Sequence, residues 1–134
     1  MTAFLLIAMA AIIPAAHAEE KSDGNALLRN CTSAVRELDK EVLKTQEGLD
    51  AVHCIGYLNG FTDSHSVDSI AKPQKPLYCL PVDGLETGQV ARIVVKYLKG
   101  RPEILHQSAR ILTALALTHA FPCEKAAGKP GKKE

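Results

Sequence analysis

Four cysteines and five histidines are the side chains of this sequence that could carry out covalent or acid–base chemistry. A cysteine nucleophile needs a histidine base within hydrogen-bond reach, and His53 next to Cys54 offers that pair of residue types. Neighbouring residues on a helix point about 100° apart, so adjacency in the sequence does not produce a hydrogen-bonded dyad. A disulfide would also remove the thiol. We therefore expect no catalytic residue.

A metal site is the second kind of chemistry that the residue types allow. Asp63, His65 and Asp68 are close together in the sequence and are all of metal-ligating types. Their spacing matches neither Cys-x-x-Cys nor His-x-x-x-His, so a solvated polar helix end is favoured over a metal site. The sequence also has no glycine-rich phosphate loop, no Gly-x-Ser-x-Gly motif and no obvious pair of catalytic carboxylates. We expect no cofactor, and a binding protein in preference to an enzyme.

The start of the sequence indicates export from the cytoplasm. Residues 4–13 form an unbroken apolar stretch, followed by Pro14 and the tripeptide Ala16-His17-Ala18, which is the pattern of a secretory signal peptide. A membrane anchor is disfavoured, because a spanning helix needs roughly 20 apolar residues and this stretch has about half that number. No Lys or Arg precedes the stretch, which leaves the position of the true start codon open. We expect residues 1–18 to be a cleaved signal peptide and the mature protein to be periplasmic.

The charge balance gives no sign of a nucleic-acid partner. All sixteen basic and fifteen acidic residues follow the signal peptide, so the formal net charge of the mature chain stays at +1. Residues 125–134 combine four lysines with Gly and Pro, the composition of a disordered tail. Four lysines are at the low edge of a polybasic lipid-binding patch, so a solvated tail is favoured. One folded domain is expected over residues 19–124, without stable membrane insertion after signal cleavage.

The apolar spacing predicts an all-α fold, a compact bundle of about four helices arranged as two antiparallel helical hairpins. No alternating run is long enough to indicate a sheet. A first helix is expected over about residues 25–38, and a second from about Glu47 that fades in the polar sequence 62–69. Gly56 and Gly60 lie one turn apart in the second helix. Because glycine inside a helix costs about 1 kcal/mol relative to alanine, we interpret the pair as a face packed closely against another backbone.

Proline residues divide the second half of the chain. Three prolines between residues 70 and 81 forbid a continuing helix and favour an extended, exposed segment. Thr87 suits the N-cap of a third helix, whose apolar stripe covers residues 90–98. Pro102 suits the first turn of a fourth helix, which ends at Phe121-Pro122. The short link between the last two predicts an antiparallel helical hairpin.

The expected positions of the helix ends favour one of the three disulfide pairings that four cysteines allow. An even number of cysteines in an exported chain favours disulfides over free thiols. Cys31 lies about seven residues before the end of the first helix and Cys54 about seven after the start of the second, so they should face each other. Cys79 and Cys123 bracket the second hairpin and should meet at its open end. We expect these two disulfides, each contributing about 3 to 4 kcal/mol.

An ordered series of short motifs runs along the chain. They are Cys54-Ile55-Gly56-Tyr57-Leu58-Asn59-Gly60, Tyr78-Cys79-Leu80-Pro81, Val94-Val95-Lys96-Tyr97-Leu98 with Arg101-Pro102, and Ala120-Phe121-Pro122-Cys123. In the order and spacing of these motifs, together with the leader peptide, the chain resembles the Rap/Tai family of periplasmic immunity proteins associated with type VI secretion. The similarity covers about residues 27–123.

The resemblance implies an all-helical domain, often dimeric, that binds and blocks a peptidoglycan amidase effector injected by neighbouring bacteria. The partners would be that amidase and a second copy of the chain, and the protein would be an inhibitor without catalysis of its own. The alternative function is a general periplasmic stress or chaperone-like helical protein without a paired toxin. Such a protein would bind many clients, whereas an inhibitor would have one tight partner.

The matched motifs are mainly structural and assign no toxin contact to any residue here. We place the expected recognition surface on the proline-bordered loop of about residues 64–78, because long exposed loops often carry binding residues. Its expected partner-binding residues are His65, Asp68, Lys72 and Lys75. A plain connecting loop is the alternative interpretation of this segment.

Overall fold

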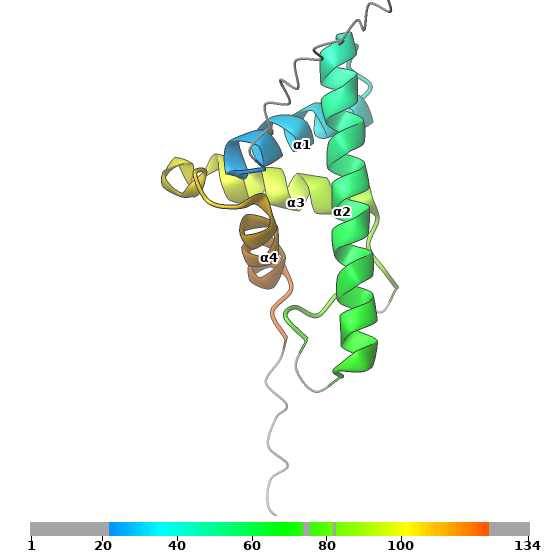
Figure 1. Ribbon diagram of the computed structural model, residues 1–134. Coiled ribbons are helices and arrows are strands. Elements are labelled where there is room, and N and C mark those ends of the chain that lie inside the picture. The colour runs from blue at the N-terminus through cyan, green and yellow to red at the C-terminus, as the bar shows by residue number, and fades with distance from the viewer. Residues whose placement is uncertain (1–21, 74–75, 82, 124–134) are drawn as a thin grey trace, which may run out of the picture.

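The computed structural model describes residues 22–73, 76–81 and 83–123 (Figure 1). Over these residues the fold is a compact helical bundle with two disulfides and no strand, which confirms the predicted all-α class. The expected signal peptide, the Lys-rich tail and Lys75 lie outside the described residues. The elements are α1 (Gly24–Leu38), α2 (Thr45–Ala71), α3 (Thr87–Lys99), the 3-10 turn η1 (Pro102–Ile104) and α4 (Ala109–Ala120).

Helix α2 is the longest element, with 27 residues and therefore a length of about 40 Å. In Figure 1 it crosses α1 and α3 and runs along one edge of the molecule. Helix α1 packs on both α2 and α3, and α4 packs mainly on α3. None of the described helices is long and apolar enough to cross a membrane.

The core forms where the four helices converge. Burial of large aliphatic side chains supplies most of the stability, at about 1.5 to 3 kcal/mol for each one removed from water. The fully buried aliphatic side chains are Leu58 of α2, Val90, Val94 and Leu98 of α3, and Leu112 and Leu117 of α4.

Gly24 marks a close approach between the start of α1 and the residues that lead into α4. The Gly24 amide donates to the carbonyl of Gln107 at 2.9 Å, and the Ala109 amide donates to the carbonyl of Ser22 at 3.0 Å. A Cβ atom at Gly24 would lie 2.8 Å from the carbonyl oxygen of Leu105 and would also contact the Leu112 side chain. Glycine is therefore required here by space.

Gly24→Ala is expected to lower the free energy of unfolding by about 1 to 3 kcal/mol, because the added methyl meets backbone that cannot move aside cheaply. Gly48→Ala is the matched control, since a Cβ at Gly48 meets nothing within 4 Å. That control should raise stability by about 0.5 to 1 kcal/mol through helix propensity. Urea unfolding of both variants checks the prediction, and equal midpoints would contradict it.

Three predicted helix ends are wrong, two of them because of contacts between distant parts of the chain. The cap of α3 is Glu86 instead of Thr87, because the Thr87 hydroxyl donates to the Asn59 side chain of α2. Helix α4 begins at Ala109, not near Pro102, because the preceding residues turn aside to bond the start of α1. Helix α2 continues to Ala71 instead of fading.

The polar end of α2 stays helical because its side chains satisfy themselves within the helix. The Thr62 hydroxyl donates to the carbonyl of Leu58, and the Ser66 hydroxyl donates to the carbonyl of Thr62, both at 3.0 Å. The predicted loop of residues 64–78 is therefore wrong in its first half, since residues 64–71 form the last two turns of α2.

Both predicted disulfide pairings are confirmed. Cys31–Cys54 joins α1 to α2 in the core, and both residues are fully buried. Cys79–Cys123 joins the segment after α2 to the end of α4, where the Cys79 amide also donates to the carbonyl of Phe121 at 3.0 Å. The two cross-links hold the long α2 against the other three helices.

Candidate functional site

The face of α2 turned away from the core carries a stripe of exposed apolar side chains. Its residues follow one another at spacings of three or four, so they share one side of the helix. We call this surface the outer face of α2, defined by Leu49, Val52, Gly56, Gly60, Asp63, Val67 and Ile70.

The four apolar side chains of the outer face stand in water. Leu49 is 60% exposed, Val52 67%, Val67 68% and Ile70 83%. Single exposed apolar residues are normal on protein surfaces, but four on one stripe of one helix form an aligned patch. Because the opposite side of α2 buries Ala51, Cys54 and Leu58 in the core, the helix is apolar on two sides. A helix of that kind usually has partners on both sides.

The interpretation of Gly56 and Gly60 as a closely packed face within the chain is wrong. A Cβ atom built on either glycine meets nothing within 4 Å, and both residues are exposed. Each costs the helix about 1 kcal/mol relative to alanine without any compensating contact inside the described chain. The two glycines instead leave the middle of the outer face without large side chains. One apolar pair, Leu49 and Val52, lies before them, and the other, Val67 and Ile70, lies after them.

His65, a predicted partner-binding residue, lies on the other side of α2. Its ring stacks on that of Tyr78 with centroids 3.7 Å apart, and its Nε2 lies 2.9 Å from the Tyr78 carbonyl oxygen. The Ser69 hydroxyl oxygen is 3.3 Å from the same nitrogen. His65 therefore fastens the segment after α2 onto the helix.

Asp68 and Lys72 continue the stripe of His65 along the last two turns of α2. They form an ion pair of 3.0 Å, and both side chains are exposed. A pair of this kind contributes about 0.3 to 0.5 kcal/mol. The structure thus brings three of the predicted partner-binding residues together on one stripe, but on the side opposite the outer face.

Tyr78 is fully buried, and its hydroxyl has no hydrogen-bond partner among the described residues. Burial disfavours the charged phenolate and raises the pKa of Tyr78 to about 12. A raised pKa means that the folded state holds this proton more tightly. The contribution of this tighter proton binding to the free energy of unfolding is complete below pH 10 and is lost as the pH rises from 10 through 12.

Tyr78→Phe is expected to remove the tyrosine that ionises near pH 12. Because an unpaired buried hydroxyl is lost, the free energy of unfolding at pH 7 should stay the same or rise by up to about 1 kcal/mol. Ultraviolet titration of the tyrosines in the wild type and the variant measures this. Titration of every wild-type tyrosine near pH 10 would contradict it.

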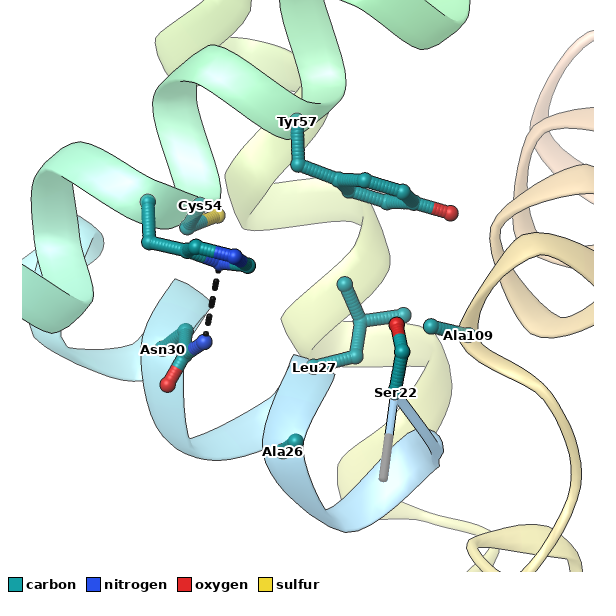
Figure 2. A pocket seen from close by; sticks show the side chains of 8 residues that line it. Ser22, Ala26, Leu27, Asn30, Cys54, Tyr57 and Ala109 are labelled. Carbon is teal, nitrogen blue, oxygen red and sulfur yellow. Dashed lines mark hydrogen bonds between the residues drawn. The ribbon is translucent and has the colours of Figure 1, made fainter. Parts of the chain in front are cut away.

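A small cavity of about 90 Å³ lies between α1 and α2 (Figure 2). Its polar lining includes Asn30, His53 and Tyr57, and Asn30 Nδ2 lies 3.1 Å from His53 Nδ1. The volume is well below the roughly 300 Å³ at which small-molecule sites begin. Because Cys54 is bonded to Cys31 and His53 pairs with Asn30, the two residues form no nucleophile and base pair.

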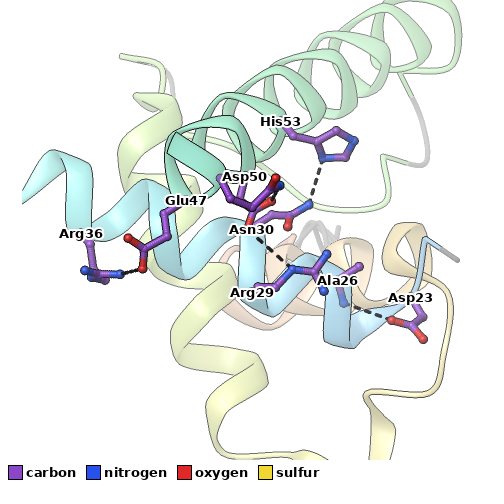
Figure 3. Close-up of polar contacts among 9 residues, drawn as sticks. Asp23, Ala26, Arg29, Asn30, Arg36, Glu47, Asp50 and His53 are labelled. Atoms are coloured by element: carbon purple, nitrogen blue, oxygen red, sulfur yellow. Dashed lines mark hydrogen bonds and ion pairs between the residues drawn. The ribbon is translucent and has the colours of Figure 1, made fainter. Parts of the chain in front are cut away.

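Ion pairs hold the first half of α2 on α1 (Figure 3). Arg36 bonds Glu47 at 2.6 Å and Glu41 at 2.7 Å, and Arg29 lies 3.7 Å from Asp50. The Lys44 backbone amide and the Arg36 guanidinium both lower the pKa of Glu47. These contacts fix the direction in which α2 presents its outer face.

No group of three or more His, Cys, Asp or Glu side chains that could hold a metal ion occurs in the part of the chain that the structure describes. Asp63 lies on the outer face of α2, whereas His65 contacts Tyr78, so the sequence cluster does not converge.

A family model described as Rap1a immunity proteins matches residues 23–123. The matched range contains all four helices and all four cysteines. Comparison with curated proteins found no match, and comparison with solved structures found none either.

Proposed function

The chain belongs to the Rap1a immunity protein family, and from this membership we propose that it protects a bacterial cell by binding and inhibiting a peptidoglycan amidase delivered by type VI secretion. The protein acts in the periplasm in this proposal, where the cell wall lies and where disulfides persist. Residues 1–18 are the proposed export signal, residues 19–124 the inhibitory domain and residues 125–134 a solvated tail.

The family match over residues 23–123 carries the proposal, and the architecture supports it. Two disulfides fix the helices before any partner arrives, so less conformational entropy is lost on binding than with a flexible inhibitor. His65, Asp68, Lys72 and Lys75 at and after the end of α2 stay proposed partner-binding residues.

An inhibition assay tests the proposed function. The purified disulfide-bonded protein is mixed with an amidase from a strain whose type VI system kills a deletion mutant of this gene, and the release of peptide from peptidoglycan is followed. We expect loss of amidase activity at one protomer of inhibitor per enzyme. Full amidase activity at a tenfold excess of inhibitor, for every amidase of the attacking strain, would refute the proposal.

The exposed outer face of α2 also favours one other function, a chaperone-like protein that binds unfolded clients. Such a protein would suppress the aggregation of unrelated proteins such as reduced insulin. An immunity protein should not, because its apolar patch is small and already committed to a specific partner. Light scattering by insulin as it is reduced, with and without the protein, distinguishes the chaperone-like function from the immunity function.

We further propose that the protein is a homodimer in which the outer face of α2 meets the same face of a second copy. The apolar residues of this face are placed symmetrically about its middle. In an antiparallel pair of helices related by a two-fold axis between residues 59 and 60, Leu49 lies opposite Ile70 of the second copy and Val52 opposite Val67. A two-fold interface needs this self-complementarity.

The glycines have a role in this arrangement. The same register puts Gly56 opposite Asp63 of the second copy, where the missing side chain leaves room for the carboxylate. Gly60 lies at the axis, where small residues let two helix backbones approach closely. The helix propensity that both glycines cost is then offset by packing across the interface.

The expected dimer is of moderate affinity. Residues 49–70 span about 32 Å of a helix about 10 Å wide, so the buried area is at the small end of specific interfaces. We therefore expect a dissociation constant of micromolar order.

A further inference from the structure

A pocket of about 360 Å³ opens between α3 and α4, apart from the surfaces discussed above. It is within the size range of sites that take a ligand group or a protein side chain. No residue of α2 lines it, so a dimer formed through the outer face of α2 leaves it open. Its lining residues are Ile93, Lys96, Tyr97, Arg101, Ala116, His119 and Ala120.

Arg101 is held in position at this pocket by two contacts. Its guanidinium carbon lies 4.0 Å above the centroid of the Tyr97 ring, and its Nη1 donates to the Tyr97 carbonyl at 2.9 Å. The Tyr97 ring in turn contacts the ring of His119, with centroids 5.6 Å apart. An arginine fixed in this way loses little conformational entropy when it binds a further group.

The pocket is basic and has no internal counter-ion. Lys96, Arg101 and His119 line it, and its lining contains no Asp or Glu. Arg36 and Arg92 each form an ion pair with a carboxylate, whereas no carboxylate of the described residues lies within ion-pair distance of Arg101. A fixed guanidinium with free N–H groups is suited to binding a carboxylate.

The rim of the pocket adds apolar surface. Ile111 and Leu115 are 49% and 44% exposed and lie at four-residue spacing with His119, so they form a stripe that leads to the pocket. Ile93 and Ala116 line the pocket itself. A partner that fits both parts carries an acidic side chain next to an apolar one.

We propose that this pocket binds an Asp or Glu side chain, flanked by apolar residues, from the amidase effector. Arg101 receives the carboxylate, Lys96 supplies a second positive charge, and the stripe of Ile111 and Leu115 packs the neighbouring apolar side chain. This inference rests on the proposed function for the identity of the partner, whereas the chemistry of the pocket is independent of it.

A titration with short peptides tests the pocket without any effector. The peptide acetyl-Leu-Asp-Leu-amide is added at millimolar concentration to the ¹⁵N-labelled wild-type protein, with acetyl-Leu-Asn-Leu-amide as the matched neutral probe. We expect the Asp peptide to shift the amide signals of Tyr97, Arg101 and His119 at least about three times more than the Asn peptide. Equal shifts with both peptides, or no shift at these residues, would overturn the inference.

A second measurement separates an effector site from a cell-wall site, because peptidoglycan fragments also carry carboxylates. Lys96→Glu reverses a charge on an exposed lining residue, and Arg101→Glu removes the fixed guanidinium. Each should weaken inhibition of the amidase at least about tenfold, whereas Arg110→Glu, exposed on α4 outside the lining, should not. Unchanged inhibition by both pocket variants would contradict an effector site. So would a disaccharide tetrapeptide from peptidoglycan that shifts the same signals more strongly than the Asp peptide.

If the wild type inhibits no amidase, the proposed function fails, and the peptide titration still decides the chemistry of the pocket.

Discussion

Reduction of both disulfides is expected to unfold the protein at 37 °C. The cysteines are separated by 23 residues in Cys31–Cys54 and by 44 in Cys79–Cys123. Loop-closure entropy gives contributions of about 3.5 and about 4 kcal/mol, or about 7 kcal/mol together. Small domains are stable by only about 5 to 15 kcal/mol in total, and this one has a small core.

Circular dichroism with and without a phosphine reductant measures the effect. We expect most helical signal to be lost at 37 °C in the reduced protein. The order of reduction gives a second observable, because Cys79 is exposed whereas Cys31 and Cys54 are fully buried. Mild reductant should open Cys79–Cys123 first and leave the other disulfide intact. A reduced protein that stays folded to the same midpoint would contradict the assigned role of the cross-links.

Val52→Asp is expected to convert the proposed dimer to a monomer. In the antiparallel register the new carboxylate faces Val67 of the second copy, and the two-fold axis places two such charges in one interface. An unpaired buried charge costs about 3 to 5 kcal/mol, so the dissociation constant should rise at least about 100-fold. Because Val52 is 67% exposed in the protomer, the fold of the monomer should not change.

The control and the rescue are specific to the register. Val42→Asp introduces the same charge at a residue that is 96% exposed outside the outer face of α2, and it should leave the dimer intact. Adding Val67→Lys to Val52→Asp places opposite charges across the axis and should restore much of the affinity. Sedimentation velocity at several concentrations measures all four proteins. A dimer that Val52→Asp leaves unchanged would exclude this face as the contact.

The helices and both disulfides could be predicted because their signals are local. Apolar spacing marks which side of each helix is buried, and glycine and proline mark where helices end. Cys31 and Cys54 lie about equally far from the α1–α2 connection, which was enough to pair them. The end of α2 could not be predicted, because the hydroxyls of Thr62 and Ser66 bond inside the helix instead of breaking it.

The surfaces were harder to predict because they depend on tertiary packing. Gly56 and Gly60 carry the same sequence signal whether they contact another helix of the chain or the solvent, and only the structure shows that their side of α2 is open. His65 has the residue type of a binding site, yet it packs on Tyr78. Arg101, which we propose to bind a carboxylate, was not among the predicted binding residues. Its four-residue spacing from Tyr97 was the available signal, but the pocket exists only because α4 packs beside α3.

One cross-linking measurement tests most directly whether the outer face of α2 is the protein-binding surface. Gly60→Cys places a thiol next to the proposed two-fold axis, where two copies bring these residues close together, and a Cβ at this position has free space within the protomer. Thr45→Cys places one on the same stripe but more than 40 Å from its counterpart in the second copy, by the rise of about 1.5 Å per residue. Under mild oxidation we predict a covalent dimer with Gly60→Cys and none with Thr45→Cys. Equal cross-linking of the two variants, or none with Gly60→Cys at concentrations where the wild type is dimeric, would contradict the assignment.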